Sequence, residues 1–214
     1  MDEEITIINS NTRKEKIKNF FINNKKLLIS IIVVLILILF SFFSYQTYKN
    51  SHRDWLANKY NSAVIEYENG DKSKVISSMK EIIEDKDSTY SPLALYILID
   101  NNLIDNKDEV NDFFDILIDK TNLELEIKNL LIYKKALYNS DFIKENELIK
   151  ILNPIINSES IWKSHALYLM AEFFYSNNER QKAKEFFNQI LILPNSNADV
   201  KLESQKRLNR DLSE

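Results

Sequence analysis

The sequence predicts an all-α protein: an N-terminal transmembrane helix, then a tetratricopeptide-like α-solenoid of about four helical hairpins plus a C-terminal capping helix. Three observations support this fold class. One stretch, Leu27–Tyr45, carries no charged residue. Apolar residues in the remainder recur three, four and seven positions apart, which is helical spacing. Gly occurs once and Pro three times, too few to supply the turns of an all-β fold.

The first element is the apolar segment LLISIIVVLILILFSFFSY, residues 27–45. Nineteen residues at about 1.5 Å rise each cover roughly 28 Å, close to the ~30 Å hydrocarbon core of a bilayer. A cleaved signal peptide has a shorter apolar region followed by small residues. Here bulky residues follow, including Tyr48 and Trp55. The segment is therefore predicted to be an uncleaved signal anchor.

Basic residues are distributed unequally around this span. Six Lys or Arg residues lie in residues 1–26, whereas only Lys49, Arg53 and Lys59 follow the span within a similar distance. This asymmetry favours a cytoplasmic N-terminus. The prediction is a single-pass inner (plasma) membrane protein, with its C-terminal domain in the periplasm of a Gram-negative bacterium. Its parts are a cytoplasmic basic tail over 1–26, the anchor over 27–45 and a periplasmic repeat domain over 46–214.

Four side chains are predicted to lie at the membrane interface, where basic and amphipathic aromatic residues are favoured. They are Lys25 and Lys26 before the span, and Tyr45 and Tyr48 at its far end. The preceding segment KIKNFFINNKK is expected to form an amphipathic turn on anionic lipid. Its apolar residues near one helical face are Ile17, Phe20 and Phe21.

Helical hairpins are predicted to fill the rest of the chain. Each consists of two amphipathic stripes separated by a polar turn. In the last hairpin, the first stripe runs through Leu167, Met170 and Phe174, SNNER forms the turn, and Pro194 stops the second helix. The earlier turns are expected at Gly70-Asp71, near Asn106 and at Ser140–Glu145.

A repeat period supports the hairpin assignment. The residues that begin the second-helix stripes, Val75, Val110, Leu148 and Ala183, are separated by 35, 38 and 35 positions. Tetratricopeptide repeats have a period of about 34 residues, and stacked hairpins cover each other's apolar faces. The final segment ADVKLESQKRLNRDL, with Val200, Leu202 and Leu208, is predicted to be the capping helix.

These residues carry a resemblance. The tetratricopeptide pattern is visible in Ala171-x2-Phe174, Ala183-x3-Phe187 and Pro194, with Asn in place of Gly in later turns. Over nearly its full length the chain resembles the bacterial ancillary SecYEG translocon subunit family. The matching features are RKEKIKNFFINNKK before the span, YENGD in the first hairpin and IWKSHALYLMAEFF opening the last. The resemblance implies two protein partners, SecYEG and a membrane-anchored periplasmic prolyl isomerase or chaperone.

The composition argues against several classes of function. Without Cys there is no thiol nucleophile, disulfide or thiolate metal site, and two His residues are too few for a His-based metal cluster. Residues 46–214 carry an excess of six acidic over basic residues, which argues against nucleic-acid binding. We therefore expect no enzymatic activity, no catalytic residue, no metal or other cofactor, and no small-molecule substrate.

Protein binding is the predicted function, and the candidate residues lie on the first helices of the hairpins. First helices line the concave face of a tetratricopeptide stack, where amphipathic Tyr rings suit an extended peptide. Core packing is the competing interpretation for each of these Tyr residues, and a lone His is usually a surface or packing residue. The protein-binding candidates are Tyr133, His165, Tyr168, Glu172 and Tyr175.

Tethered recruitment follows as the predicted mechanism, because an anchor raises the local concentration of the binding domain beside an export channel. The protein would be an accessory subunit of the Sec translocon that links it to periplasmic chaperones or emerging clients. One alternative is an oligomeric structural or cell-division scaffold of the inner membrane. Another is an anchored receptor that faces the cytosol.

Overall fold

A computed structural model describes residues 14–16 and 18–212 of the chain. In this part the protein is helical throughout and contains no strand, which confirms the predicted all-α class. The chain divides into two compact units, one ending at Trp55 and one beginning at Leu56. Residues 1–13 and Ile17 of the predicted basic tail, Arg13 among them, lie outside the described residues. The division into cytoplasmic, spanning and periplasmic parts remains a prediction.

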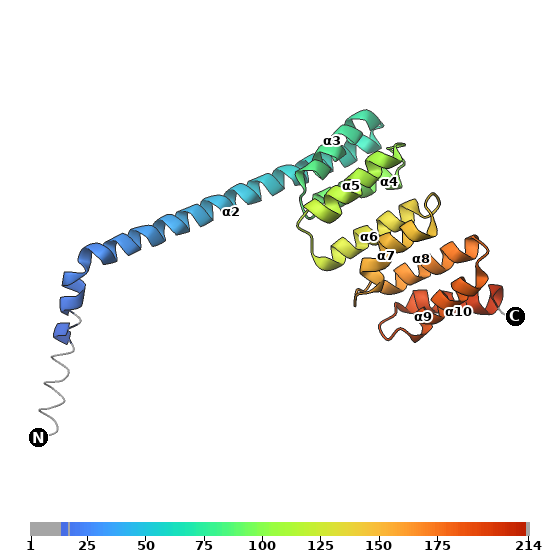
Figure 1. Cartoon of the computed structure of the whole chain (residues 1–214). Coiled ribbons are helices and arrows are strands. Elements are labelled where there is room, and N and C mark those ends of the chain that lie inside the picture. Colours follow the sequence, from blue (N-terminus) through green and yellow to red (C-terminus); the bar gives the residue numbers. More distant parts are fainter. Residues whose placement is uncertain (1–13, 17, 213–214) are drawn as a thin grey trace, which may run out of the picture. The chain divides into compact units, whose positions relative to one another are not determined.

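Helix α2 spans Lys25–Glu68 and contains the whole predicted anchor (Figure 1). It is the one helix of the described residues that is long and apolar enough to cross a membrane, and none of its most apolar window is buried in the protein. Its aliphatic and aromatic side chains between Leu27 and Tyr45 are exposed, apart from the half-buried Leu28. Only Leu56 and Ala63 of α2 are fully buried, and both belong to the second unit.

The second unit is a succession of antiparallel helical hairpins, as predicted. The end of α2 packs with α3 and α4 through a cluster that includes Leu56, Ala63, Val75 and Leu95. Figure 1 shows the later helices following one another in chain order. Their bounds are α3 Lys72–Asp85, α4 Tyr90–Asp100, α5 Lys107–Lys120, α6 Leu125–Asn139, α7 Glu145–Ile156, α8 Lys163–Ser176, α9 Arg180–Ile192 and α10 Ala198–Asp211.

Turn residues explain where several helices end and begin. Gly70 has a φ of +90°, which places it in the left-handed region that glycine adopts without steric cost. The corresponding positions in later hairpins hold Asn102 (φ 49°) and Asn178 (φ 63°). Asn tolerates this conformation better than most residues, so the hairpins form with Asn in place of Gly. The side chain of Asn106 then accepts hydrogen bonds from the first backbone N–H groups of α5.

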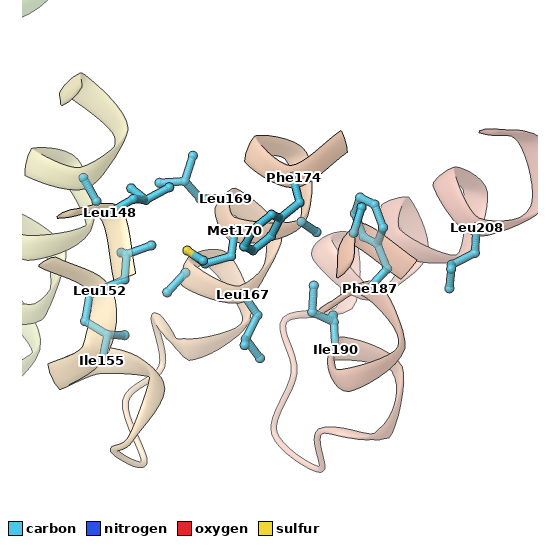
Figure 2. Close-up of a cluster of buried hydrophobic side chains, with 14 of the residues drawn as sticks. Leu148, Leu152, Ile155, Leu167, Leu169, Met170, Phe174, Phe187, Ile190 and Leu208 are labelled. Carbon is cyan, nitrogen blue, oxygen red and sulfur yellow. The ribbon is translucent and has the colours of Figure 1, made fainter. Parts of the chain in front are cut away.

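The repeat period predicted from the sequence corresponds to equivalent core positions. Val75, Val110, Leu148 and Ala183 are all at most 1% exposed. Each is the first buried residue of its second helix, so each hairpin closes around the same point. Figure 2 shows the core of the last hairpins, where side chains of α7, α8 and α9 meet.

Helix α10 covers the end of this core, as expected of a capping helix. Leu208 and Leu212 are buried, and the Ser204 hydroxyl donates a hydrogen bond of 2.7 Å to the carbonyl of Val200. Leu202 lies six residues before Leu208, on another face of the helix, and is 57% exposed. The apolar stripe predicted for this helix therefore lacks Leu202 and gains Leu212.

Candidate protein-binding site

A groove lies between the first helices of the second and third hairpins, α4 and α6. Its volume is about 480 Å³. Apolar side chains from both helices line it, together with the polar residues of the loops that precede them. The apolar lining consists of Pro92, Leu93, Tyr96, Ile127 and Leu130, and the polar lining of Ser88, Thr89, Asn122 and Glu124.

The sequence of α4 explains why the groove is apolar. The helix reads YSPLALYILID, so apolar residues occur on every face. Ala94, Leu95 and Leu98 supply the core contacts and are fully buried. Leu93 remains 38% exposed, and Ile127 on α6 is 39% exposed. These two side chains are apolar surface that the core does not use, and they lie in a concave position where such surface favours binding of a ligand.

Local hydrogen bonds fix the beginning of α4 beside the groove. The Asp87 carboxylate accepts bonds of 2.8 Å from the backbone N–H groups of both Thr89 and Tyr90. The buried Ser91 hydroxyl donates a bond of 2.5 Å to the carbonyl of Ile82 in α3. The groove wall formed by α4 is therefore attached to the preceding hairpin at its first turn.

Tyr96 occupies the centre of this surface. It lines the groove and also a smaller adjoining pocket of about 180 Å³, formed with Ile99, Asp100, Phe114, Lys134, Leu137 and Tyr138. Its hydroxyl is buried and has no hydrogen-bond partner among the described residues. Burial and the nearby Asp100 carboxylate raise the Tyr96 pKa to about 12. The ammonium of Lys134 lies 4.1 Å from the centre of the Tyr96 ring.

The next junction, between α6 and α8, is closed. The Glu126 carboxylate of α6 accepts hydrogen bonds from the Ser160 hydroxyl at 2.7 Å and from the backbone N–H of Ile161 at 3.3 Å. The indole N–H of Trp162 donates to the backbone carbonyl of Glu126 at 3.1 Å. The loop entering the last hairpin is thus bound to the previous first helix.

Two of the predicted candidates lie in this closed junction. Tyr133 stacks on Trp162 with ring centres 6.0 Å apart, and His165 lies 5.9 Å from Tyr133 and 5.2 Å from Trp162. Burial raises the Tyr133 pKa and lowers the His165 pKa, which favours the neutral form of each. These rings hold two hairpins together.

Of the other three candidates, Glu172 and Tyr175 contact the capping helix and Tyr168 packs against α9. The Arg207 guanidinium of α10 forms a bidentate ion pair with Glu172, with N–O distances of 2.7 and 2.6 Å. The same guanidinium lies 4.3 Å from the Tyr175 ring and also pairs with Asp211. Tyr168 packs edge-on against Phe187 at 5.5 Å, and its pKa is raised to about 12, chiefly by burial.

The structure therefore gathers the five candidates into two groups, Tyr133 with His165 and Tyr168 with Glu172 and Tyr175. Each group has partners within the protein, and their role in protein binding remains a prediction. Of the predicted membrane-interface residues, Lys25 and Lys26 begin α2, and Tyr45 and Tyr48 are exposed along it.

The predicted candidates do not include the groove residues Leu93, Tyr96 and Ile127. The available signal was the apolar character of YSPLALYILID on all faces, because a helix that packs on one side does not need it. Trp162 and Arg207 were also missed, since their partners lie more than thirty residues away in the sequence. Among the described residues, no group of three or more His, Asp or Glu is placed to hold a metal ion.

Comparison with known protein families gives a match over part of the chain. The chain is similar to the tetratricopeptide repeat-like domain family over residues 18–108, which include the whole of α2, α3 and α4. Domains of this kind are protein-interaction modules and are generally non-enzymatic. No curated protein and no solved structure matches the chain. The match supports a protein-interaction module, and the specific partners are a separate question.

Proposed function

We propose that this protein is a membrane-tethered protein-binding module that captures an apolar protein segment in the α4–α6 groove. The groove itself carries the proposal. Leu93 and Ile127 offer exposed apolar surface on its two sides. An extended peptide complements this surface, because its side chains are apolar at intervals.

The proposed tether is the apolar part of α2. The excess of Lys and Arg before Leu27 favours a cytoplasmic N-terminus and a periplasmic repeat domain at the inner membrane. Anchoring allows a groove of low affinity to be occupied, because the local concentration of the ligand at a tethered site can reach millimolar order. A tethered groove would therefore bind proteins that lie at or near the membrane surface.

The proposed partners follow from the resemblance to ancillary SecYEG translocon subunits. In that role the anchor places the groove beside SecYEG. The groove then receives emerging clients, or binds a membrane-anchored periplasmic prolyl isomerase or chaperone that acts on them. Such clients present apolar, unfolded segments. The groove is lined largely by apolar side chains, which suit a segment of that kind.

Photocrosslinking in native membranes tests this proposal. A photoreactive amino acid is placed at Leu93 or at Ile127, and the matched controls carry it at Ile192 or Leu202, which are exposed apolar positions outside the groove. Captured proteins are identified by mass spectrometry. We expect translocon subunits, chaperones or exported clients from the groove positions and not from the controls.

A second control deletes residues 27–45 and keeps the groove. We expect this variant to lose the membrane partners while still binding apolar peptides in solution. Equal capture from all four positions would contradict the groove assignment. Capture of nothing but further copies of this chain would favour the oligomeric scaffold over the translocon subunit.

A further inference from the structure

Two cavities lie in a row between α4 and α6, and Tyr96 lines both of them. The α4–α6 groove is lined by the earlier residues of the two helices, up to Tyr96 and Leu130. The adjoining pocket of about 180 Å³ is lined by later residues, among 96–100 and 134–138, and by Phe114. Residue numbers increase along both helices from the groove to the pocket, so the two cavities form one track along the helix axes.

The spacing of the cavities along this track fits an extended chain. The lining shifts from Leu93 to Asp100 on α4 and from Ile127 to Leu137 on α6, which corresponds to about 10 and 15 Å of helix rise. In an extended segment the side chains that face the same way recur every second residue, about 6.6 Å apart. Two apolar side chains four positions apart are separated by about 13 Å and can therefore enter one cavity each.

Charged residues along the track change sign between its middle and its ends. Lys134 lies in the middle, with its ammonium 4.1 Å from the centre of the Tyr96 ring. Carboxylates line the two ends, Glu124 in the groove and Asp100 in the pocket. Lys134 is half-buried, and among the described residues it forms no ion pair. The track therefore attracts a negative charge at its middle and repels one at either end.

We propose that the preferred ligand is an extended protein segment with two apolar side chains four positions apart and an acidic side chain midway between them. This inference rests on the proposed function of the α4–α6 groove and specifies the sequence that the groove binds. One apolar side chain occupies the groove beside Leu93 and Ile127, and the other occupies the adjoining pocket beside Leu137. The acidic side chain pairs with the Lys134 ammonium at the Tyr96 ring. A segment that is apolar but lacks the charge forms no such pair, so the site discriminates among unfolded segments.

Fluorescence anisotropy with labelled peptides tests the spacing, using the full-length chain in nanodiscs. The reference peptide carries two Leu residues four positions apart with Glu midway, and the other peptides carry the Leu residues two or seven positions apart. We expect the reference peptide to bind about tenfold more tightly than the two-position peptide, whose Leu residues cannot reach both cavities. A helical ligand would instead bind most tightly with Leu residues seven positions apart, and that result would overturn the proposal.

Substitution of Lys134 tests the charge. With the natural chain, replacing the midway Glu of the reference peptide by Gln is expected to weaken binding about fivefold. Lys134→Met keeps an unbranched side chain beside the Tyr96 ring and should remove this preference, so that the Glu and Gln peptides bind equally. Lys128→Met is the matched control, because Lys128 is also on α6 but lines neither cavity. A preference for Glu that persists in Lys134→Met would overturn the assigned pairing.

Filling the adjoining pocket tests the second apolar position. Leu137 is 49% exposed, so the larger ring of Leu137→Trp can occupy the pocket without entering the core. Ile149→Trp is the matched control, since Ile149 is exposed outside both cavities. We expect the reference and two-position peptides to bind equally to Leu137→Trp, whereas Ile149→Trp keeps the tenfold difference; circular dichroism checks that both variants fold.

The same measurements separate this inference from the proposed function. Apolar peptides that bind the natural chain irrespective of spacing and of the midway charge would overturn the inference and leave the groove as a binding site. Binding of none of these peptides would overturn both.

Discussion

The α4–α6 and α6–α8 junctions join equivalent parts of the same repeat, yet one is open and the other is closed. At the first, a groove of about 480 Å³ exposes Leu93 and Ile127. At the second, Glu126 binds the Ser160 hydroxyl and the Ile161 backbone, and Trp162 fills the space against Tyr133. The difference shows that a repeat need not be used uniformly along a stack. One junction stabilises the domain, while the next retains apolar surface for a ligand.

Substitution of Trp162 by Ala should produce the largest contrast between the two junctions. The change removes the stack with Tyr133, the contact with His165 and the hydrogen bond to Glu126. We expect the free energy of unfolding to fall by about 3 kcal/mol, at the lower end for loss of a large aromatic side chain because Trp162 is half-buried. Urea unfolding of the detergent-solubilised protein, followed by circular dichroism, measures this loss.

Leu93→Ala in the open groove is the matched variant. It should cost less than about 1 kcal/mol of stability, because a partly exposed side chain leaves a smaller cavity when truncated. It should also reduce the capture of proteins by a photocrosslinker at Ile127. The Trp162→Ala variant, where it is folded, should capture as much from that position as the natural chain. Equal losses of stability at the two positions would remove the distinction between an open and a closed junction.

Glu126→Ala should produce an intermediate effect. It leaves the buried Ser160 hydroxyl and the Ile161 N–H without their acceptor. We expect a loss of about 2 kcal/mol, within the range for unpaired polar groups. Both bonds end on the same Glu126 oxygen, so the amide oxygen of Glu126→Gln can still accept them and should recover about half of that loss, since the uncharged acceptor is weaker. Faster hydrogen exchange confined to residues 157–163 is the accompanying local signature, and unchanged exchange there would contradict the role of Glu126.

The smallest expected effect on the free energy of unfolding comes from titration of Tyr96, and it is confined to high pH. The Tyr96 pKa is raised from 10.0 to about 12 in the folded protein. Between pH 10 and 12 the unfolded chain loses this proton while the folded chain retains it, so stability falls as pH rises through that window and is unaffected below it. Tyr96→Phe removes this contribution and should make the decline less steep.

The matched variant at the closed junction is Tyr133→Phe, because burial also raises the Tyr133 pKa. At neutral pH, Tyr96→Phe should leave stability unchanged or slightly higher, since the hydroxyl that it removes is buried and has no partner in the described part of the chain. Equilibrium unfolding measured at several pH values from 8 to 12 checks both expectations. A substantial loss of stability in Tyr96→Phe at neutral pH would mean that the hydroxyl is satisfied within the protein.

Local sequence alone determined the helices, the turns and the apolar span. A run of uncharged residues from Leu27 needs no tertiary information to be recognised, because its length and composition are local properties of the chain. Gly70, Asn106 and the recurring residues from Val75 to Ala183 likewise act within a single hairpin. Turn conformation, helix capping and the spacing of one apolar face are short-range properties that neighbouring residues specify.

Only the tertiary structure decided which junction is open. The contacts that close α6 against α8 join residues more than thirty positions apart, such as Glu126 with Ser160 and with Trp162. Periodicity marks Leu93, Tyr96 and Tyr133 alike as first-helix residues, but it does not say which of them has a neighbour in space. Whether an apolar side chain becomes core or groove depends on how closely the next hairpin approaches, and that distance is set by long-range packing.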